Sequence, residues 1–387
     1  MKNFFKRIPF DRINWVTSIF LTSTFLISLT AVPYYIWKHG LNMFQISLFF
    51  TFYIATGLSI TLGYHRLFSH LSFKAKWPVK LFVLLFGAAS FENAALDWCS
   101  DHRRHHKHVD GNLDPYDISM GFWFAHIGWL LFKLKPETPM DNVNDLRKDS
   151  LVMWQYKWIT LLSIMLGLVF PTFLGILFDG SSGAIGGFLI GGIARIVAVQ
   201  QSTFCINSLC HTFGNRPYSS KCSARDSWFA ALITFGEGYH NYHHEFQHDY
   251  RNGVKYWQFD PTKWIIWVLS KIQLTTNLRR VASNKILITE IKETQKKIIF
   301  NLENLNIELP KWKIKLPEST YNFVKLYHKK LKNKLENFKT SANRLQTKTD
   351  NKINISKEVV SEWHKEINEV MEVLELLTLE SAFLSKF

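Results

Sequence analysis

Four long stretches of this chain are apolar and almost free of charged residues. They cover residues 13–37, 41–64, 158–178 and 184–209, and only the last of them contains a charge, Arg195. A helix of roughly 20 apolar residues crosses the hydrocarbon core of a bilayer, whereas a helix in a soluble core shows shorter apolar runs with polar interruptions. The pattern therefore predicts an all-α integral membrane protein with four transmembrane helices.

Charged and polar residues concentrate in the segments between and after these stretches. Residues 38–40 and 179–183 are short connections, whereas 65–157 and the chain beyond residue 211 are long and carry many Lys and Arg residues. Because the positive-inside rule places such segments in the cytoplasm, we expect both termini and both long segments there, forming a helical cap. The first apolar stretch exceeds the ~7–15 residues of a signal-peptide core, so we expect it to be retained.

A fifth apolar stretch, residues 79–96, carries the polar residues Ser90, Glu92 and Asn93 toward its end. One more crossing would place the two long polar segments on opposite sides of the bilayer. We therefore expect an interfacial or partly buried helix at 79–96.

The end of the chain differs in composition from the rest. We divide the sequence into a membrane domain at 1–281 and a basic, helical cytoplasmic tail of unknown role at 282–387. Its basic run, 311–348, is typical of a solvated helix or of one attracted to anionic lipid headgroups. Beyond it, apolar residues alternate in steps of three and four, which predicts an amphipathic or short coiled-coil helix. These residues are Val360, Trp363, Ile367, Val370, Leu374 and Leu377.

Composition adds two constraints to this picture. The 387 residues carry a net charge of +15, which we assign to the cytoplasmic face of a membrane protein, and we expect no nucleic-acid partner. There are four cysteines, Cys99, Cys205, Cys210 and Cys222. Since they fall at the cytoplasmic face or within the membrane, we expect free thiols rather than disulfides.

Histidine is the most informative residue type, because most of the 15 histidines fall in short motifs. On an α-helix, positions i, i+3 and i+4 point to one side, so the repeated spacing HxxHH aims three imidazoles at one volume. Two histidines five residues apart diverge by about 140° on a regular helix and converge only if the helix ends or distorts. The motifs are "HRLFSH" (His65, His70), "HRRHH" (His102, His105, His106), "HNYHH" (His240, His243, His244) and "NSLCH" (His211).

The histidines are either a basic surface patch or a metal site. Each motif lies at or beyond the cytoplasmic end of an apolar stretch, so all of them are expected at the same membrane depth. A structural zinc site uses four ligands, usually including Cys, and no CxxC pair accompanies these histidines. Imidazole-rich sites suit iron, copper or zinc. Eight or nine ligands indicate two ions, and two redox ions at a bilayer suggest oxygen chemistry on a lipid-like substrate.

From about residue 13 to 281 the chain resembles the membrane fatty-acid desaturases, most closely the stearoyl-CoA-type Δ9 acyl desaturases without a fused haem domain. The motifs that carry the resemblance are "HRLFSH", "HRRHHKHVD", "DPYD", "HIGWLL", "NSLCHTFGNRPY" and "GEGYHNYHHEFQHDYR". The resemblance implies four crossings under a cytoplasmic helical cap, a kinked acyl tunnel and a centre of two iron ions (Fe2+), which zinc could replace in a purified sample.

The resemblance also implies roles for individual residues, with no catalytic residue beyond the metal ligands. Substrate contacts would come from residues at the tunnel mouth, at its bend and at its far end. The ligands would be His65, His70, His102, His105, His106, His211, His240, His243 and His244, with Asn207 acting through a water. The substrate contacts would be Asn93, Asp101, Lys133, Phe204, Tyr53 and Gly57.

The expected activity is oxygen-dependent insertion of a cis double bond, at Δ9, into a saturated acyl chain during unsaturated fatty acid biosynthesis. Acyl-CoA is the expected carrier. Ser100 replaces a basic residue usual in the animal enzymes, and "FKLKP" (132–136) keeps only part of a basic pair. An acyl-carrier protein or a phospholipid therefore stays open as the carrier.

Three alternatives remain from the sequence. The chain could desaturate intact glycerolipids, act as a di-iron lipid hydroxylase, or be a non-catalytic metal-binding membrane transporter. A transporter is expected to place ionisable groups at mid-membrane, and here Arg195 is the only clear candidate.

Dioxygen and two electrons must come from outside the chain, since it shows no haem-binding, flavin or nicotinamide motif. We expect a small cytochrome or a ferredoxin, with its reductase, as the electron donor. Membrane lipid surrounds the protein in this interpretation.

Overall fold

The computed structural model describes residues 10–315 and scattered residues between 318 and 369. These form two compact units. The first comprises the chain up to Arg216 together with Lys221–Arg280, and the second comprises Pro217–Ser220 and the chain from Val281 onward.

Within the described residues, three helices are long and apolar enough to cross a membrane. The first is α2, Trp15–His39. The second joins α3, Met43–Leu58, to a π-helix, η2, Ser59–Ser69. It begins with a capping box, in which Asn42 accepts from the Gln45 backbone while the Gln45 side chain accepts from the Asn42 backbone. The third spans Ser150–Thr212. The chain is therefore a mostly helical membrane protein.

The third long helix turns back on itself near its middle. Asp179 (φ −148°, ψ 34°) and Gly180 (φ 56°, ψ −136°) leave the helical conformation, and Gly180 tolerates its positive φ because it lacks a Cβ. On the two sides of this turn the backbones of Gly175 and Gly183 approach so closely that a Cβ on either would clash. The two arms contain the two predicted apolar stretches, and the turn lies in their predicted connection. The elements are α7 (Ser150–Ile164), η7 (Met165–Val169), α8 (Phe170–Gly186), η8 (Gly187–Ala194) and α9 (Arg195–Thr212).

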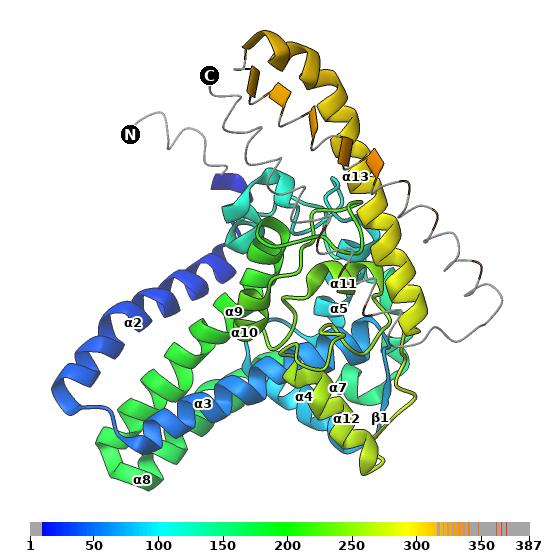
Figure 1. Ribbon diagram of the computed structural model, residues 1–387. Helices are drawn as coiled ribbons and strands as arrows, with labels where there is room; N and C mark the ends of the chain where they lie inside the picture. Colours follow the sequence, from blue (N-terminus) through cyan, green and yellow to red (C-terminus); the bar gives the residue numbers. More distant parts are fainter. Residues whose placement is uncertain are drawn as a thin grey trace. The chain divides into compact units, whose positions relative to one another are not determined.

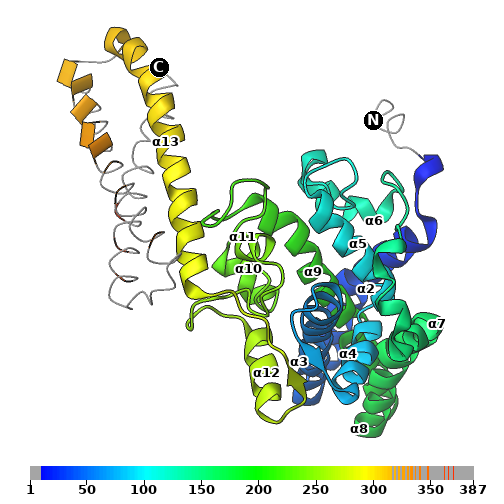
Figure 2. The same ribbon diagram turned by 90° about the vertical axis from the view of Figure 1, so that its right-hand side faces the viewer.

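The predicted helix at 79–96 is divided in the structure. It forms α4, Trp77–Ala89, and the start of α5, Ala95–His108, joined by a turn. With 13 residues, α4 is shorter than the roughly 20 residues that a crossing needs. It packs against η2, and it lies beside α3 and α7 (Figure 2). The single-helix prediction was wrong because the polar residues at its end fold into the turn, while the expectation that it does not cross agrees with its length.

Short elements complete the first unit, and its core joins η2, α4, α5, α7 and α12 through residues such as Leu84, Leu96 and Ile266. Two short strands pair antiparallel, with Lys74 opposite Thr276. All four cysteines are free, as predicted. The short elements are η1 (Phe10–Arg12), β1 (Lys74–Ala75), η3 (Ile118–Met120), η4 (Phe124–Gly128), α6 (Trp129–Leu131), η5 (Asp141–Val143), η6 (Leu146–Lys148), α10 (Trp228–Ile233), α11 (His240–Glu245), α12 (Pro261–Lys271) and β2 (Thr275–Thr276) (Figure 1).

The second unit contains α13, Ser283–Lys315. Its first part buries Ile286, Leu287 and Ile291, which agrees with a helical start of the predicted tail. Most of the basic run 311–348 and all of the apolar residues of the predicted coiled coil lie outside the described residues.

Candidate metal centre and cavity

The nine predicted ligand histidines lie in two groups in the first unit. In each group the ring nitrogens that face inward lie within 4.8 Å of one another. The rings come from η2 and its end, α5, α9 and α11. The first cluster, of five, is His65, His70, His102, His106 and His243; the second, of four, is His105, His211, His240 and His244.

Each HxxHH motif contributes to both clusters, which corrects the expectation that its three rings share one volume. In "HRRHH", His102 and His106 belong to the first cluster and His105 to the second. In "HNYHH" the assignment is reversed, because His243 joins the first cluster while His240 and His244 join the second. Residues i and i+4 stay together and residue i+3 points to the neighbouring cluster. The repeated motif therefore bridges two adjacent sites.

A π-helix brings His65 and His70 together. The His70 backbone N–H donates to the carbonyl of His65 at 3.1 Å, an i→i+5 bond that ends η2. In a π-helix, residues five apart lie close to one full turn apart, so the two side chains face the same side, and their ring centroids are 4.7 Å apart. This is the distortion that the five-residue spacing requires.

The spacing of the inward nitrogens fits a bound ion. Within the first cluster, Nε2 of His243 lies 3.0 Å from Nε2 of both His65 and His106. In the second, Nε2 of His240 lies 3.1 Å from Nε2 of both His211 and His244. Metal–nitrogen bonds are about 2.0–2.1 Å long, so two nitrogens at right angles around one ion lie about 3 Å apart.

Seven of the nine rings are buried and two, His106 and His244, are partly buried. Burial, together with the neighbouring rings, lowers the pKa of five rings well below the ordinary value and holds them neutral; these are His102, His106, His240, His243 and His244. A neutral imidazole has a free lone pair for a metal. Because His102 is 6% exposed and His243 is 1% exposed, the clusters are not a surface basic patch.

Acidic or hydroxyl side chains hold the outward nitrogens of three rings. His65 Nδ1 lies 2.8 Å from Glu237 Oε2, and His105 Nδ1 lies 2.8 Å from Asp114 Oδ1. His211 Nδ1 lies 2.6 Å from the hydroxyl oxygen of Ser223. Such partners fix the tautomer and orientation of metal-binding histidines. Sequence reasoning assigned these partners no role, although Asp114 and Glu237 lie within the quoted motifs "DPYD" and "GEGYH".

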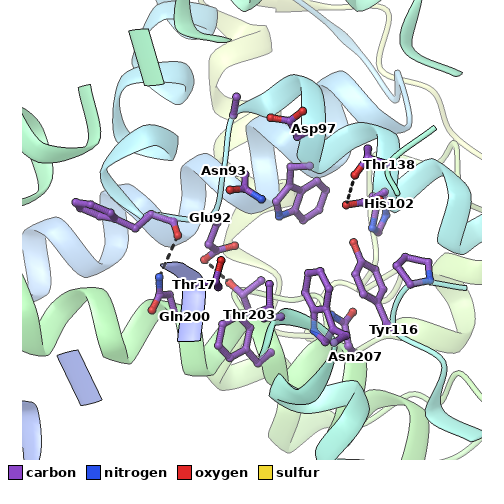
Figure 3. Close-up of a pocket in the computed structure, with 18 of the residues that line it drawn as sticks. Thr17, Glu92, Asn93, Asp97, His102, Tyr116, Thr138, Gln200, Thr203 and Asn207 are labelled. Atoms are coloured by element: carbon purple, nitrogen blue, oxygen red, sulfur yellow. Dashed lines mark hydrogen bonds between the residues drawn. The ribbon is translucent and has the colours of Figure 1, made fainter. Parts of the chain in front are cut away.

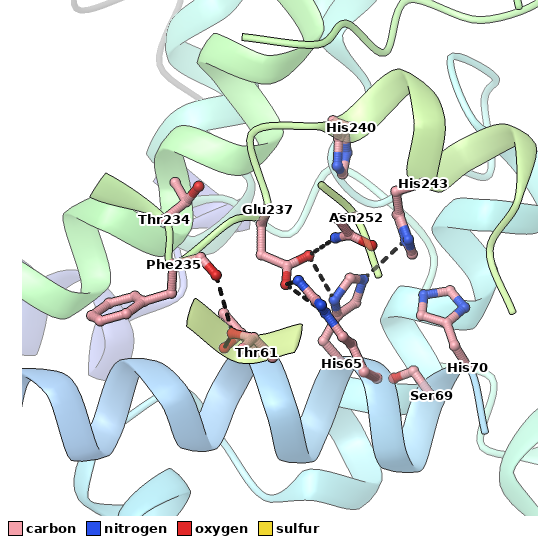
Figure 4. Close-up of polar contacts among 12 residues, drawn as sticks. Thr61, His65, Ser69, His70, Thr234, Phe235, Glu237, His240, His243 and Asn252 are labelled. Atoms are coloured by element: carbon pink, nitrogen blue, oxygen red, sulfur yellow. Dashed lines mark hydrogen bonds and ion pairs between the residues drawn. The ribbon is translucent and has the colours of Figure 1, made fainter. Parts of the chain in front are cut away.

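Glu237 also belongs to a buried network with Arg66 and Asp260. Arg66 donates to Glu237 Oε1 at 2.8 Å and to Asp260 Oδ2 at 3.1 Å. The Asn252 amide donates to Glu237 Oε2 at 2.5 Å (Figure 4). Burial alone would raise the pKa of Glu237, but Arg66 and His65 hold it below the ordinary value. The carboxylate therefore stays ionised beside His65.

A cavity of about 1070 Å³ opens beside the first cluster (Figure 3). Of the cluster residues, His65 and His102 line it, and so does Asn207. Four of the predicted substrate residues, Asn93, Asp101, Lys133 and Phe204, also line it.

Tyr53 and Gly57 do not line this cavity. The Tyr53 hydroxyl bonds to Ser202 and to the carbonyl of Ile233, and a Cβ at Gly57 would clash with the ring of Phe235. Both residues pack against Phe235. Their predicted role at the far end of a tunnel finds no support in this cavity.

Position 100 does not supply a polar group to the cavity. Ser100 is fully buried, and its hydroxyl donates to Asn142 at 2.7 Å. Among the cations that line the cavity, Arg104 binds Asp101 and Lys135 binds Asp117. Each of these two charges is thus already paired with an acid.

Glu92 is a cavity residue to which the sequence assigned no chemistry. Thr203 donates to its Oε1 at 2.9 Å, and the carboxyl is enclosed by the protein. Burial raises the pKa of Glu92 from 4.5 to about 8. The carboxyl is therefore mostly protonated at neutral pH.

The variant Glu92→Gln should be more stable than the wild type at pH 8, with little difference at pH 4.5. In the wild type the unfolded state loses this proton near pH 4.5 while the folded state keeps it to about 8, so stability falls as pH rises between these values. At pH 8 the unfolding temperature of the variant should exceed that of the wild type by roughly 2–4 °C for each kcal/mol gained in the free energy of unfolding. The matched control is Glu137→Gln, an exposed carboxyl on the same cavity. Equal gains at both pH values would contradict the prediction.

Comparison with known proteins shows which family shares this sequence. A family model described as "Fatty acid desaturase" matches residues 43–271. Acyl-CoA desaturase 1 of Saccharomyces cerevisiae is 41% identical over 279 residues, which cover 70% of this chain and 54% of the yeast protein. Stearoyl-CoA desaturase of Homo sapiens is 32% identical over 276 residues (70% of this chain, 74% of the human protein).

A third relative, sn-1 stearoyl-lipid 9-desaturase of Synechocystis sp., is 35% identical over 273 residues, covering 68% of this chain and 80% of the cyanobacterial protein. The chain spans about half the length of the yeast relative. Because the family model covers more than half of the residues and these relatives match at such identities, this chain belongs to the fatty acid desaturase family.

Proposed function

We propose that this protein is an oxygen-dependent fatty acyl desaturase that inserts a cis double bond at Δ9 into a saturated acyl chain carried by coenzyme A. The observation that carries the proposal is the pair of buried histidine clusters beside a large cavity. Relatives named acyl-CoA desaturase, stearoyl-CoA desaturase and sn-1 stearoyl-lipid 9-desaturase support the reaction and its position.

Two iron ions would be held by the five and four histidines of the clusters, with Asn207 reaching one of them through water. The close spacing of the inward-facing nitrogens fits this role, and burial keeps rings such as His243 neutral by lowering their pKa. When bound and reduced, the two ions supply the activation of dioxygen that removal of hydrogen from an unactivated methylene requires, since no side-chain acid or base can do this.

The reaction consumes one dioxygen, two electrons and two protons, and it yields one double bond and two waters. The protein's own residues bind the acyl chain, orient the histidines and exclude water from the cavity. Glu237 and Asp114 hold His65 and His105 in one tautomer. Each methylene of the acyl chain that enters the cavity contributes about 0.8 kcal/mol of binding. External electrons would come from a small cytochrome or ferredoxin.

A glycerolipid acyl chain is the second candidate substrate. Ser100 is buried away from the cavity, and Arg104 and Lys135 are paired with acids. Few free cations are thus left for a headgroup with several phosphates. An assay of the purified protein with stearoyl-CoA and with a stearoyl-glycerolipid distinguishes the two carriers. The true substrate is the one that yields the monounsaturated product.

We also propose four membrane crossings, with both termini and the metal centre on the cytoplasmic side. The turn at Asp179–Gly180 supports this count because it divides Ser150–Thr212 into two arms, each longer than the roughly 20 residues that a crossing needs. The basic segments 65–157 and beyond 211 support the orientation.

Expression in cells that lack their own desaturase tests the proposal. New monounsaturated acyl chains with the double bond at carbon 9 are expected from the wild type. A fatty-acid profile unchanged from that of empty cells would contradict the proposed function.

Asp114→Asn should lower product formation and metal retention by roughly 10–100-fold, the usual effect of losing a partner of a metal-binding histidine. The amide can accept only through its oxygen, so His105 loses part of its orientation. Metal per chain after dialysis, measured beside product yield, checks this. Asp145→Asn, which loses only a surface pair with Arg103, is the control.

A further inference from the structure

The turn that joins α4 to α5 has an unusual backbone. Phe91 (φ 58°) and Asn93 (φ 69°) are non-glycine residues in the left-handed region, a conformation that costs energy and persists only where surrounding contacts impose it. The turn places Phe91, Glu92 and Asn93 in the wall of the cavity (Figure 3). A strained turn at this place requires contacts that hold it.

One helix, α9, supplies most of these contacts, and the Tyr64 hydroxyl of η2 donates to the carbonyl of Asn93 at 3.4 Å. Arg195 Nη1 donates to the carbonyl of Ala89 at 2.6 Å. Gln200 Nε2 donates to the carbonyls of Ser90 at 3.3 Å and Phe91 at 3.1 Å. Thr203 then binds the Glu92 side chain. Successive donors of α9 therefore hold successive residues of the turn.

Arg195 is fully buried, and its other hydrogen bonds in the described part of the chain also go to backbone carbonyls. They join it to Gly167 in η7 at 2.8 Å and to Gly191 in η8 at 3.1 Å. A buried charge is costly even when its donors are satisfied. An apolar residue would fill this space at a lower cost. The arginine therefore indicates that the backbone at Ala89, Gly167 and Gly191 must keep a fixed spacing.

The ring of Phe91 is fixed from two further sides. It stacks on Phe20 of α2, with ring centroids 5.1 Å apart. A Cβ at Gly167 would clash with it, so the ring packs directly on the backbone to which Arg195 also binds. The turn and its side chains thus have one defined position.

The same helix reaches the second histidine cluster. Beyond Gln200, α9 places Phe204 and Asn207 in the cavity wall and ends one residue after His211. The 11 residue steps from Gln200 to His211 span about 16.5 Å at 1.5 Å per step. Because α9 holds the turn near one end and a cluster residue at the other, it sets the distance between them.

Building on the proposed desaturase function, we propose that Arg195 and Gln200 are positioning residues that lock the Ser90–Asn93 turn onto α9. They thereby determine which pair of methylenes in the acyl chain lies beside the histidine clusters. Loosening the turn lets the chain bind in neighbouring registers.

Gln200→Leu tests this, with Arg195→Lys as a second change. We expect each variant to make additional isomers in which the double bond is shifted along the chain. The ratio of the main isomer to the shifted isomers should fall roughly fivefold, which corresponds to the loss of a hydrogen bond worth about 1 kcal/mol. Metal per chain should stay as in the wild type. The matched control is Gln201→Leu, the next residue on α9, which bonds to His126 instead of the turn and should leave a single isomer.

A single unshifted isomer from Gln200→Leu, even at lower yield, would overturn the inference. If that variant does not fold, Gln200→Met keeps the side-chain length and removes the donor. Failure of both to fold while Gln201→Leu folds would show a structural role only, and would also overturn it. A wild type that makes no unsaturated product would instead refute the proposed function.

Discussion

Replacing His105 with alanine should abolish desaturation while the protein still accumulates in the membrane. His105 Nε2 faces His244 Nε2 at 3.3 Å, and its Nδ1 contacts Asp114. Losing the ring removes one of four nitrogens from the second cluster. The loss of product should therefore exceed the ~100-fold upper range seen for partners of metal ligands.

Metal analysis gives this experiment a readout independent of activity. The wild type should hold two ions per chain and His105→Ala about one, since the first cluster keeps all five histidines. His108→Ala, on the same helix but in neither cluster, is the matched control and should keep both ions. Retained activity with two ions in His105→Ala would contradict the ligand role.

Removing the Glu237 carboxylate should have the largest effect on stability. Glu237→Ala leaves the fully buried Arg66 with Asp260 as its remaining acid and takes the partner from His65. Breaking one side of a buried ion pair typically costs about 3–5 kcal/mol, a large part of the ~5–15 kcal/mol that stabilises a folded domain. Glu237→Gln keeps an acceptor for Arg66 and should cost less.

Thermal unfolding in detergent, together with the amount of metal bound per chain, tests the predicted order of stability of the wild type and the two variants. We expect the unfolding temperature to fall from the wild type through Glu237→Gln to Glu237→Ala, and metal retention to fall in both variants. The control is Asp149→Asn, which weakens a more exposed ion pair with Lys80 and should change stability little. An alanine variant with wild-type stability would refute the importance of the network.

Local patterns explain how much of the fold the sequence predicts. Apolar runs give the long helices because the length needed to cross a bilayer is fixed by its thickness, and the connection at 179–183 does contain the turn at Asp179–Gly180. The 79–96 stretch was harder to predict. The turn that divides it into α4 and α5 accepts hydrogen bonds from α9, whose donors lie more than 100 residues away in the chain.

The histidine spacing shows the same limit for the site. Periodicity indicates that His102, His105 and His106 share one side of a helix. It does not show that this side faces two clusters, which depends on where α11 places His243 and His244. Likewise, the convergence of His65 and His70 needs the π-helix η2. Their role as metal ligands stays a prediction for the metal analysis.

By itself, the sequence determined the membrane class, the long helices and the residue types of the candidate centre, because these follow from hydrophobic length and from motifs within a few residues. Only the tertiary structure decided how the nine histidines divide, that Glu237 contacts His65 and Asp114 contacts His105, that Ser100 turns away from the cavity, and that Tyr53 and Gly57 lie apart from it. These features depend on contacts between residues far apart in the chain, which local patterns do not encode.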